Sequence, residues 1–159
     1  MVASSGRGNR ELKGTMGAAA RKGADRVPVG VVVVGHGRVA AEMVDTLQSV
    51  VGDVEAVEGV ACTPTEGPEA IRARVGEAIE RVERGAGVIV LTDMLGDTAS
   101  NVSLQLASRR AQLEVVAGVN MPMLVKLTTS RYDTSAHELA NFIRRYGQDH
   151  IFWPTGTTP

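Results

Sequence analysis

Cysteine and aromatic residues are scarce in this chain of 159 residues, which has one cysteine, one tryptophan, two tyrosines and two phenylalanines. The lone Cys62 cannot form an internal disulfide, as expected for a protein of a reducing compartment, and no pattern around it indicates a catalytic thiol. With a net charge of −1 and so few rings to stack on bases, the chain lacks the electrostatic footprint of a nucleic-acid-binding protein. These scarcities exclude disulfide scaffolds and disfavour nucleic acid as a partner.

Long apolar runs are also missing from the sequence. No stretch approaches the length of a membrane span, and the amino terminus lacks the apolar segment of a signal peptide. We therefore expect a cytoplasmic location without direct membrane insertion. A hydrophobic fraction of 43% with both charge signs well mixed fits a single globular domain.

The chain divides into three parts by composition. Arginine and lysine scattered among glycine, alanine and serine predict a flexible basic extension over residues 1–26. Regular apolar patterns predict one domain over residues 27–150, and residues 151–159 form a short carboxyl-terminal tail.

Within this domain, strand and helix patterns alternate. The predicted strands cover residues 29–34, 54–60, 88–91 and 113–119, and the predicted helices cover residues 40–51, 71–82, 99–109 and 139–146, with a short helix starting at Pro122. This alternation predicts an α/β fold: a doubly wound sheet of about four parallel strands in the order 2-1-3-4, with helices on both faces.

The segment Val31–Gly37, VVVVGHG, places His36 on the loop at the end of the first strand. Ligands of open parallel sheets bind outside the carboxyl ends of the strands, at the point where the strand order reverses. Gly35 and Gly37 lack Cβ atoms, so another backbone or a phosphate can approach the imidazole closely. The pattern fits a titratable nucleophile, and equally a histidine that ends a strand and hydrogen-bonds to the next loop.

The loop after the third strand would face His36 across this crevice and begins with Asp93. A carboxylate there can accept one ring N–H and leave the other nitrogen free as a nucleophile or base. Residues 96–101 lead into a helix whose first N–H groups favour an anion, most simply a phosphate. The simpler interpretation makes Asp93 a loop residue and Thr98 or Ser100 a helix cap.

Other ligand sites are disfavoured. No glycine-rich loop ends in Lys-Ser or Lys-Thr, so a Walker-type phosphate site is not expected. His137 and His150 lack the spacing of zinc ligands and are interpreted as surface side chains. We expect neither a metal nor an organic cofactor.

Three segments together resemble a known family: VVVVGHG at 31–37, LTDMLGDTASN at 91–101 and VVAGVNMPML at 115–124. They are similar to the signature segments of the mannose-family enzyme IIA domain of the bacterial phosphotransferase system, abbreviated PTS. The resemblance covers residues 28 to about 148.

The resemblance implies a role for each matching residue. His36 matches the phosphorylated histidine and Asp93 the aspartate that hydrogen-bonds to it, while Asn120 matches a loop-shaping asparagine. The phosphate-binding positions are Gly37, Gly96, Thr98 and Ala99. In the family, HPr donates the phosphoryl group and a IIB component accepts it, so the implied partners are HPr and a separate IIB protein or regulatory target.

The sequence departs from the family pattern after Gly96. The family has a second glycine, then serine and proline, whereas this chain has Asp97, Thr98 and Ala99. A carboxylate at position 97 would repel an incoming phosphoryl group if it pointed into the pocket, and would matter little if it pointed outward. We therefore expect Asp97 to modulate the site.

Family members also pair as homodimers through an added antiparallel strand at the carboxyl-terminal end. Residues 124–132 and the tail around residues 151–153 are the two candidates for that strand.

Two other functions remain open. A regulatory, non-transport IIA-like module would bind its partner according to the phosphorylation state of His36. A tetrapyrrole metal chelatase also has a histidine after its first strand, but that interpretation leaves the segments around Asp93 and Asn120 unexplained.

Overall fold

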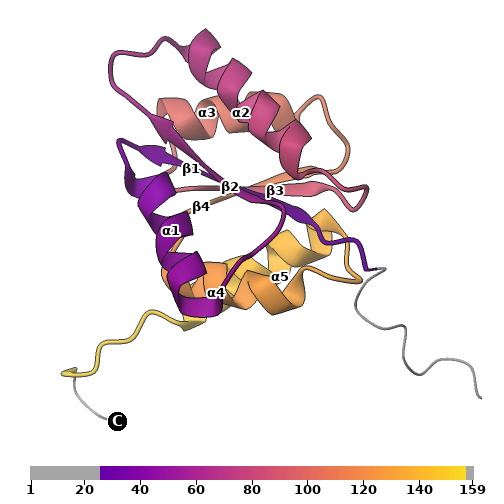
Figure 1. Cartoon of the computed structure of the whole chain (residues 1–159). Helices are drawn as coiled ribbons and strands as arrows, with labels where there is room; N and C mark the ends of the chain where they lie inside the picture. The colour runs from indigo at the N-terminus through magenta and orange to yellow at the C-terminus, as the bar shows by residue number, and fades with distance from the viewer. Residues whose placement is uncertain (1–25, 157–159) are drawn as a thin grey trace, which may run out of the picture.

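The computed structural model describes residues 26–156 as a three-layer α/β structure (Figure 1). The predicted basic extension therefore lies outside the described residues, apart from Arg26. No helix of the described part is long and apolar enough to span a bilayer.

A four-stranded parallel sheet forms the middle layer. Its strands are β1 (Gly30–His36), β2 (Val57–Cys62), β3 (Val88–Thr92) and β4 (Leu113–Ala117), in the order β2-β1-β3-β4. The predicted strand order 2-1-3-4 is thus confirmed. The strand order reverses between β1 and β3, and ligands of open parallel sheets bind outside the carboxyl ends of the strands at such a point.

Five helices cover the two faces of the sheet. They are α1 (Val39–Val51), α2 (Pro68–Val82), α3 (Thr98–Ala107), α4 (Met121–Ser130) and α5 (Ala136–Asp149). Helices α2 and α3 lie on one face, and α1, α4 and α5 lie on the other (Figure 1). The sheet is therefore doubly wound, as predicted.

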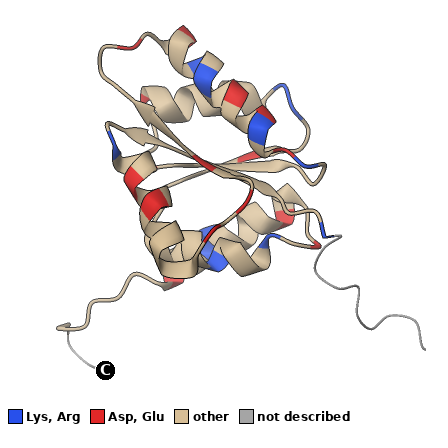
Figure 2. Cartoon of the chain, viewed as in Figure 1, with Lys and Arg blue, Asp and Glu red and all other residues tan. Residues whose placement is uncertain are grey.

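The valines of β1 supply both halves of the core. Val31 and Val33 pack in the cluster on the α1, α4 and α5 side, whereas Val32 and Val34 pack in the cluster on the α2 and α3 side. All four are buried. Neither β1 nor β3 contains Asp, Glu, Lys or Arg, and Figure 2 shows these four residue types mainly on helices and loops. The two strands that end at the site are thus held rigidly from both faces.

Two strands are shorter than predicted because of local backbone conformation. β2 begins at Val57 rather than residue 54, and Ala56 just before it has a positive φ of 49°. β4 ends at Ala117 rather than residue 119 because Gly118 turns the chain with a φ of 88°. A positive φ interrupts a strand, and at a non-glycine residue the sequence gives no sign of it.

Neither candidate for the antiparallel edge strand is a strand within the described single chain, and for residues 124–132 the prediction is wrong. Residues 124–132 fall mostly in α4, which starts with Asn120 as its N-cap and a proline in its first turn. Residues 151–153 belong to no strand. Antiparallel pairing in the described residues is limited to an isolated bridge between Pro28 and Tyr132.

Asn120 shapes the loop after β4, as the resemblance implied. Its Oδ1 accepts a hydrogen bond from the N–H of Met123 at 3.1 Å, and its Nδ2 donates to the carbonyl of Gly147 at 3.2 Å. The side chain therefore caps α4 and ties it to α5.

Candidate functional site

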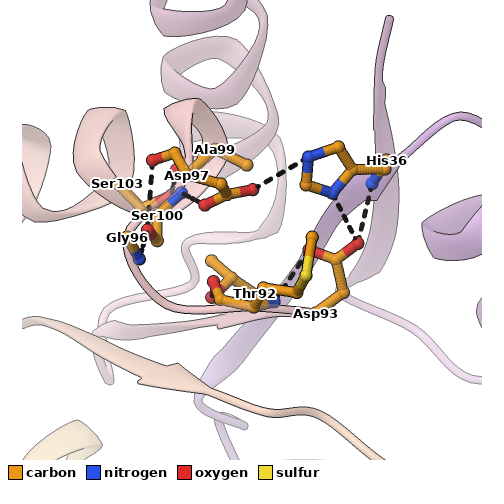
Figure 3. Close-up of polar contacts among 9 residues, drawn as sticks. His36, Thr92, Asp93, Gly96, Asp97, Ala99, Ser100 and Ser103 are labelled. Carbon is orange, nitrogen blue, oxygen red and sulfur yellow. Dashed lines mark hydrogen bonds and ion pairs between the residues drawn. The ribbon is translucent and has the colours of Figure 1, made fainter.

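The ends of β1 and β3 bring His36 and Asp93 into contact. His36 is the last residue of β1, and Asp93 follows β3 directly. Oδ2 of Asp93 lies 2.9 Å from Nδ1 of His36 and accepts the backbone N–H of the same residue at 2.9 Å (Figure 3). The predicted pairing of imidazole and carboxylate is present, and it leaves Nε2 as the nitrogen that Asp93 does not touch.

The neighbouring backbone holds Asp93 in this orientation. Its second oxygen, Oδ1, accepts the N–H of Met94 at 2.9 Å. A Cβ atom at Gly35 would lie 3.2 Å from Asp93 Oδ2. The absence of a side chain at Gly35 thus makes room for the carboxylate of Asp93. Gly37 differs, because a Cβ there meets nothing within 4 Å, and its φ of 52° lies in the left-handed region that favours glycine.

The two groups shift each other's titration. The hydrogen bond and the charge of Asp93 raise the pKa of His36 above its usual 6.5, although burial acts in the opposite direction. Burial raises the pKa of Asp93, but the hydrogen bonds and charge of His36 outweigh it, and the net pKa lies below its ordinary value. The pair therefore favours an ionised carboxylate beside an imidazole that keeps its Nδ1 proton.

The carboxylate of Asp97 faces the other side of the imidazole. Its Oδ2 lies 3.4 Å from Nε2 of His36, and the side chain is only 12% exposed (Figure 3). Of the two orientations that the sequence left open, Asp97 has the one directed at the histidine. Nε2, the ring nitrogen that Asp93 does not contact, therefore has the carboxylate of Asp97 beside it.

Asp97 also caps α3. Its Oδ1 accepts the N–H of Ser100 at 2.7 Å, so the cap is Asp97 and not Thr98 or Ser100. The hydroxyl of Ser100 accepts the N–H of Gly96 at 2.9 Å and donates to the carbonyl of Asp97 at 3.2 Å. Ser100 was missed as a positioning residue; a serine three residues after an aspartate at a helix start was the available signal.

The remaining predicted phosphate positions lie at the start of α3. Gly96 turns the chain with a φ of 91°, Thr98 is exposed, and Ala99 is buried. Thr98 and Ala99 are the first two helical residues, so their N–H groups have no acceptor within the helix. This end of the helix carries the positive end of the dipole, which suits an anion.

Cys62 and the other histidines do not contribute to this site. Cys62 is paired with His36 in the β1–β2 register, but it is buried, and desolvation raises the pKa of its thiol. His137 is an exposed side chain, as expected, with Nδ1 2.9 Å from Glu114. His150 is partly buried instead, because its ring stacks on Tyr146 at 3.7 Å between centroids.

Comparison with known proteins places this chain in a family. The family model described as "PTS system fructose IIA component" matches residues 30–144. The sorbose-specific EIIA component of Lacticaseibacillus casei is 24% identical over 119 residues, which cover 75% of this chain and 86% of that protein. The mannose-specific EIIAB component of Escherichia coli K12 is 28% identical over 105 residues, but the match spans only 32% of that protein.

Solved structures agree with this assignment. The mannose/sorbose-specific IIA subunit from Enterococcus faecalis superposes with a TM-score of 0.72 at 26% identity, over 83% of this chain and 97% of the other. The IIA protein of the fucose utilization operon of Streptococcus pneumoniae gives a TM-score of 0.68 at 25% identity, over 79% and 92% of the two chains. With the family model covering most of the chain, this protein belongs to the mannose family of PTS IIA components, which are phosphotransferases.

Proposed function

We propose that this protein is a phosphocarrier that accepts a phosphoryl group from phospho-HPr on Nε2 of His36. It passes the group to a separate IIB component or to a regulatory target. The observation that carries the proposal is the contact between Asp93 and Nδ1, which keeps the ring proton there and leaves the lone pair on Nε2.

The transfer needs only groups present at the site. The Nε2 lone pair attacks phosphorus, the bond between phosphorus and the donor's imidazole nitrogen breaks, and that nitrogen keeps the electron pair. Nδ1 of His36 retains its hydrogen bond to Asp93, which stabilises the positive charge that the ring acquires. The N–H groups of Thr98 and Ala99 donate hydrogen bonds to the phosphoryl oxygens. Such transfer depends on positioning and charge more than on covalent machinery.

An apolar rim beside His36 suits the docking of other proteins. Met94 and Leu95 directly follow Asp93 and are 52% and 75% exposed. Exposed side chains of this size are typical of protein interfaces. The names of the relatives, sorbose-specific and mannose-specific components, support a sugar PTS as the setting.

The proposal is tested by incubating the purified protein with enzyme I, HPr and labelled phosphoenolpyruvate. We expect one acid-labile phosphoryl group per chain, and peptide mapping at alkaline pH should place it on His36. A protein that stays unlabelled, or one labelled at another residue, would contradict the proposal.

The pH dependence of the transfer rate is expected to follow His36. Only the imidazole without a proton on Nε2 is nucleophilic, so the rate should rise with pH and level off above the pKa of His36, which Asp93 raises above 6.5. In Asp93→Asn the midpoint should move to lower pH. A single-turnover profile with phospho-HPr, compared with NMR titration of the His36 ring, measures both. A midpoint unaffected by the substitution would show that Asp93 does not control the titration.

A regulatory role is favoured by Asp97, because its carboxylate stands beside the nitrogen to be phosphorylated. Two unit charges about 4 Å apart repel by about 4 kcal/mol at an effective dielectric of ~20, and salt screens part of this. We expect Asp97→Asn, which keeps a good helix cap, to be phosphorylated about tenfold faster, and Asp97→Gly faster still, with larger gains at low salt. Rapid-quench rates at several ionic strengths check this. If both variants match the parent, Asp97 does not restrain transfer.

The expected homodimer rests on the apolar tail. Ile151, Phe152 and Trp153 are 75%, 73% and 77% exposed. Light scattering of the parent and of a triple-serine variant at these positions would measure the oligomeric state, and we expect the variant to be monomeric.

A further inference from the structure

The ligand atoms of His36, Asp93 and Asp97 form a compact group. One ligand atom from each residue lies within 4.8 Å of the others. Among the described residues, this is the cluster in which histidine and carboxylates come together at metal-ligand spacing. The three side chains are therefore candidates for binding a metal ion.

The separation of Nε2 and Asp97 Oδ2 fits two ligands of one ion. It is 3.4 Å, whereas a charge-assisted N–H···O bond is about 2.7–2.9 Å long. Two ligands each about 2.0–2.1 Å from a tetrahedral zinc ion lie about 3.4 Å apart. Asp97 Oδ2 is moreover buried and without a hydrogen-bond partner in the described part of the chain. The distance between Nε2 and Oδ2 is too long for a strong hydrogen bond and equals that between two ligands of one zinc ion.

Hydrogen bonds at their other atoms hold both ligands in place. Nδ1 of His36 is fixed by Asp93 at 2.9 Å, and Oδ1 of Asp97 is fixed by the N–H of Ser100 at 2.7 Å. A carboxylate behind a histidine ligand is the usual support of zinc sites, because it sets the tautomer and orients the ring. These hydrogen bonds hold the two ligand atoms at their separation of 3.4 Å.

We propose that His36 Nε2 and Asp97 Oδ2 form a binding site for a zinc-like divalent ion, supported by Asp93 and Ser100. Imidazole favours ions such as zinc, nickel and copper over magnesium. Two protein ligands leave the other positions of a tetrahedral ion for water or a small anion. The ion is not a resident cofactor; it occupies the nitrogen that the phosphoryl group needs and therefore inhibits its transfer. The inhibition rests on the proposed function, whereas the metal site does not.

Binding is tested on the full chain without a histidine tag, by calorimetric titration with zinc in a buffer that does not chelate metals. We expect one site per chain, at least about tenfold weaker in Asp97→Asn and about 10- to 100-fold weaker in Asp93→Asn. Asn at position 97 keeps the cap of α3, so circular dichroism should be unchanged. Magnesium in place of zinc should give no comparable heat.

The matched control is His137→Ala. This residue forms a second histidine–carboxylate pair, with Glu114, far out on the surface. Zinc affinity that is lost in His137→Ala, or kept in full in Asp97→Asn, would overturn the proposed site, as would an absence of binding to the parent chain.

A second experiment tests the competition. Purified phospho-HPr is mixed with the chelator-treated protein, and the rate is then measured at increasing zinc concentrations. We expect zinc to slow the parent, and Asp97→Asn to need at least about tenfold more zinc for the same effect. Equal sensitivity of the two proteins would overturn the competition. A chain that binds zinc in the calorimeter but is never phosphorylated in chelator would refute the phosphocarrier function and leave the metal site standing.

Discussion

His36→Ala is expected to abolish labelling by phospho-HPr while the fold stays intact. The imidazole is the nucleophile of the proposed transfer, and its side chain is 45% exposed at the end of β1, so little packing is lost. Labelling with radioactive phosphate measures the first effect, and thermal unfolding measures the second.

His137→Ala and His150→Ala serve as controls for this variant. Both keep His36 and its two carboxylates, so their labelling rates should equal that of the parent chain. Label that persists on His137 or His150 in His36→Ala would refute the assignment of the nucleophile.

Asp93→Asn is expected to slow phosphoryl transfer by about two orders of magnitude or more, since an orienting carboxylate sets the tautomer of its histidine. Both oxygens of Asp93 accept N–H donors: Oδ2 takes the ring and backbone N–H of His36, and Oδ1 takes that of Met94. In either orientation the new amide group places N–H₂ against a donor. We expect a modest loss of stability of about 1 kcal/mol beside the large loss of rate.

Rapid-quench kinetics with phospho-HPr and urea unfolding separate these two effects. Glu114→Gln is the matched control, because it makes the same chemical change at the surface pair with His137. We expect parental rates for that variant. Parental rates in Asp93→Asn would mean that His36 and Asp93 do not act together.

The sheet and the central pair of the site followed from the sequence. Runs such as Val29–Val34 are buried on both faces of a parallel sheet, and this pattern predicts strands that adjoin at their carboxyl ends. His36 and Asp93 each come at such an end, so their contact required only the strand order. The fold and this contact depend on patterns that extend over many residues.

The direction of Asp97 could not be predicted in the same way. It depends on the turn at Gly96, with its φ of 91°, and on the choice of Asp97 rather than Thr98 as the cap of α3. Both are local and compatible with several backbone paths. The edge strand expected over residues 124–132 was wrong for a different reason: it came from the resemblance, whereas the proline in the first turn and buried Leu124 and Leu127 one turn apart favour the helix observed.

The aliphatic residues of β1 and β3 also determine how much the core sequence of such a protein can change during evolution. Exchanges among valine, isoleucine and leucine in a core of conserved volume usually cost less than about 1.5 kcal/mol. The backbone positions of His36 and Asp93 depend on the register of the two strands, in which Val34 pairs with Thr92, and not on which aliphatic residues fill them. Aliphatic residues of β1 and β3 can therefore be exchanged while His36 and Asp93 keep their positions, which is compatible with an identity of only 24% to 28% to the two relatives.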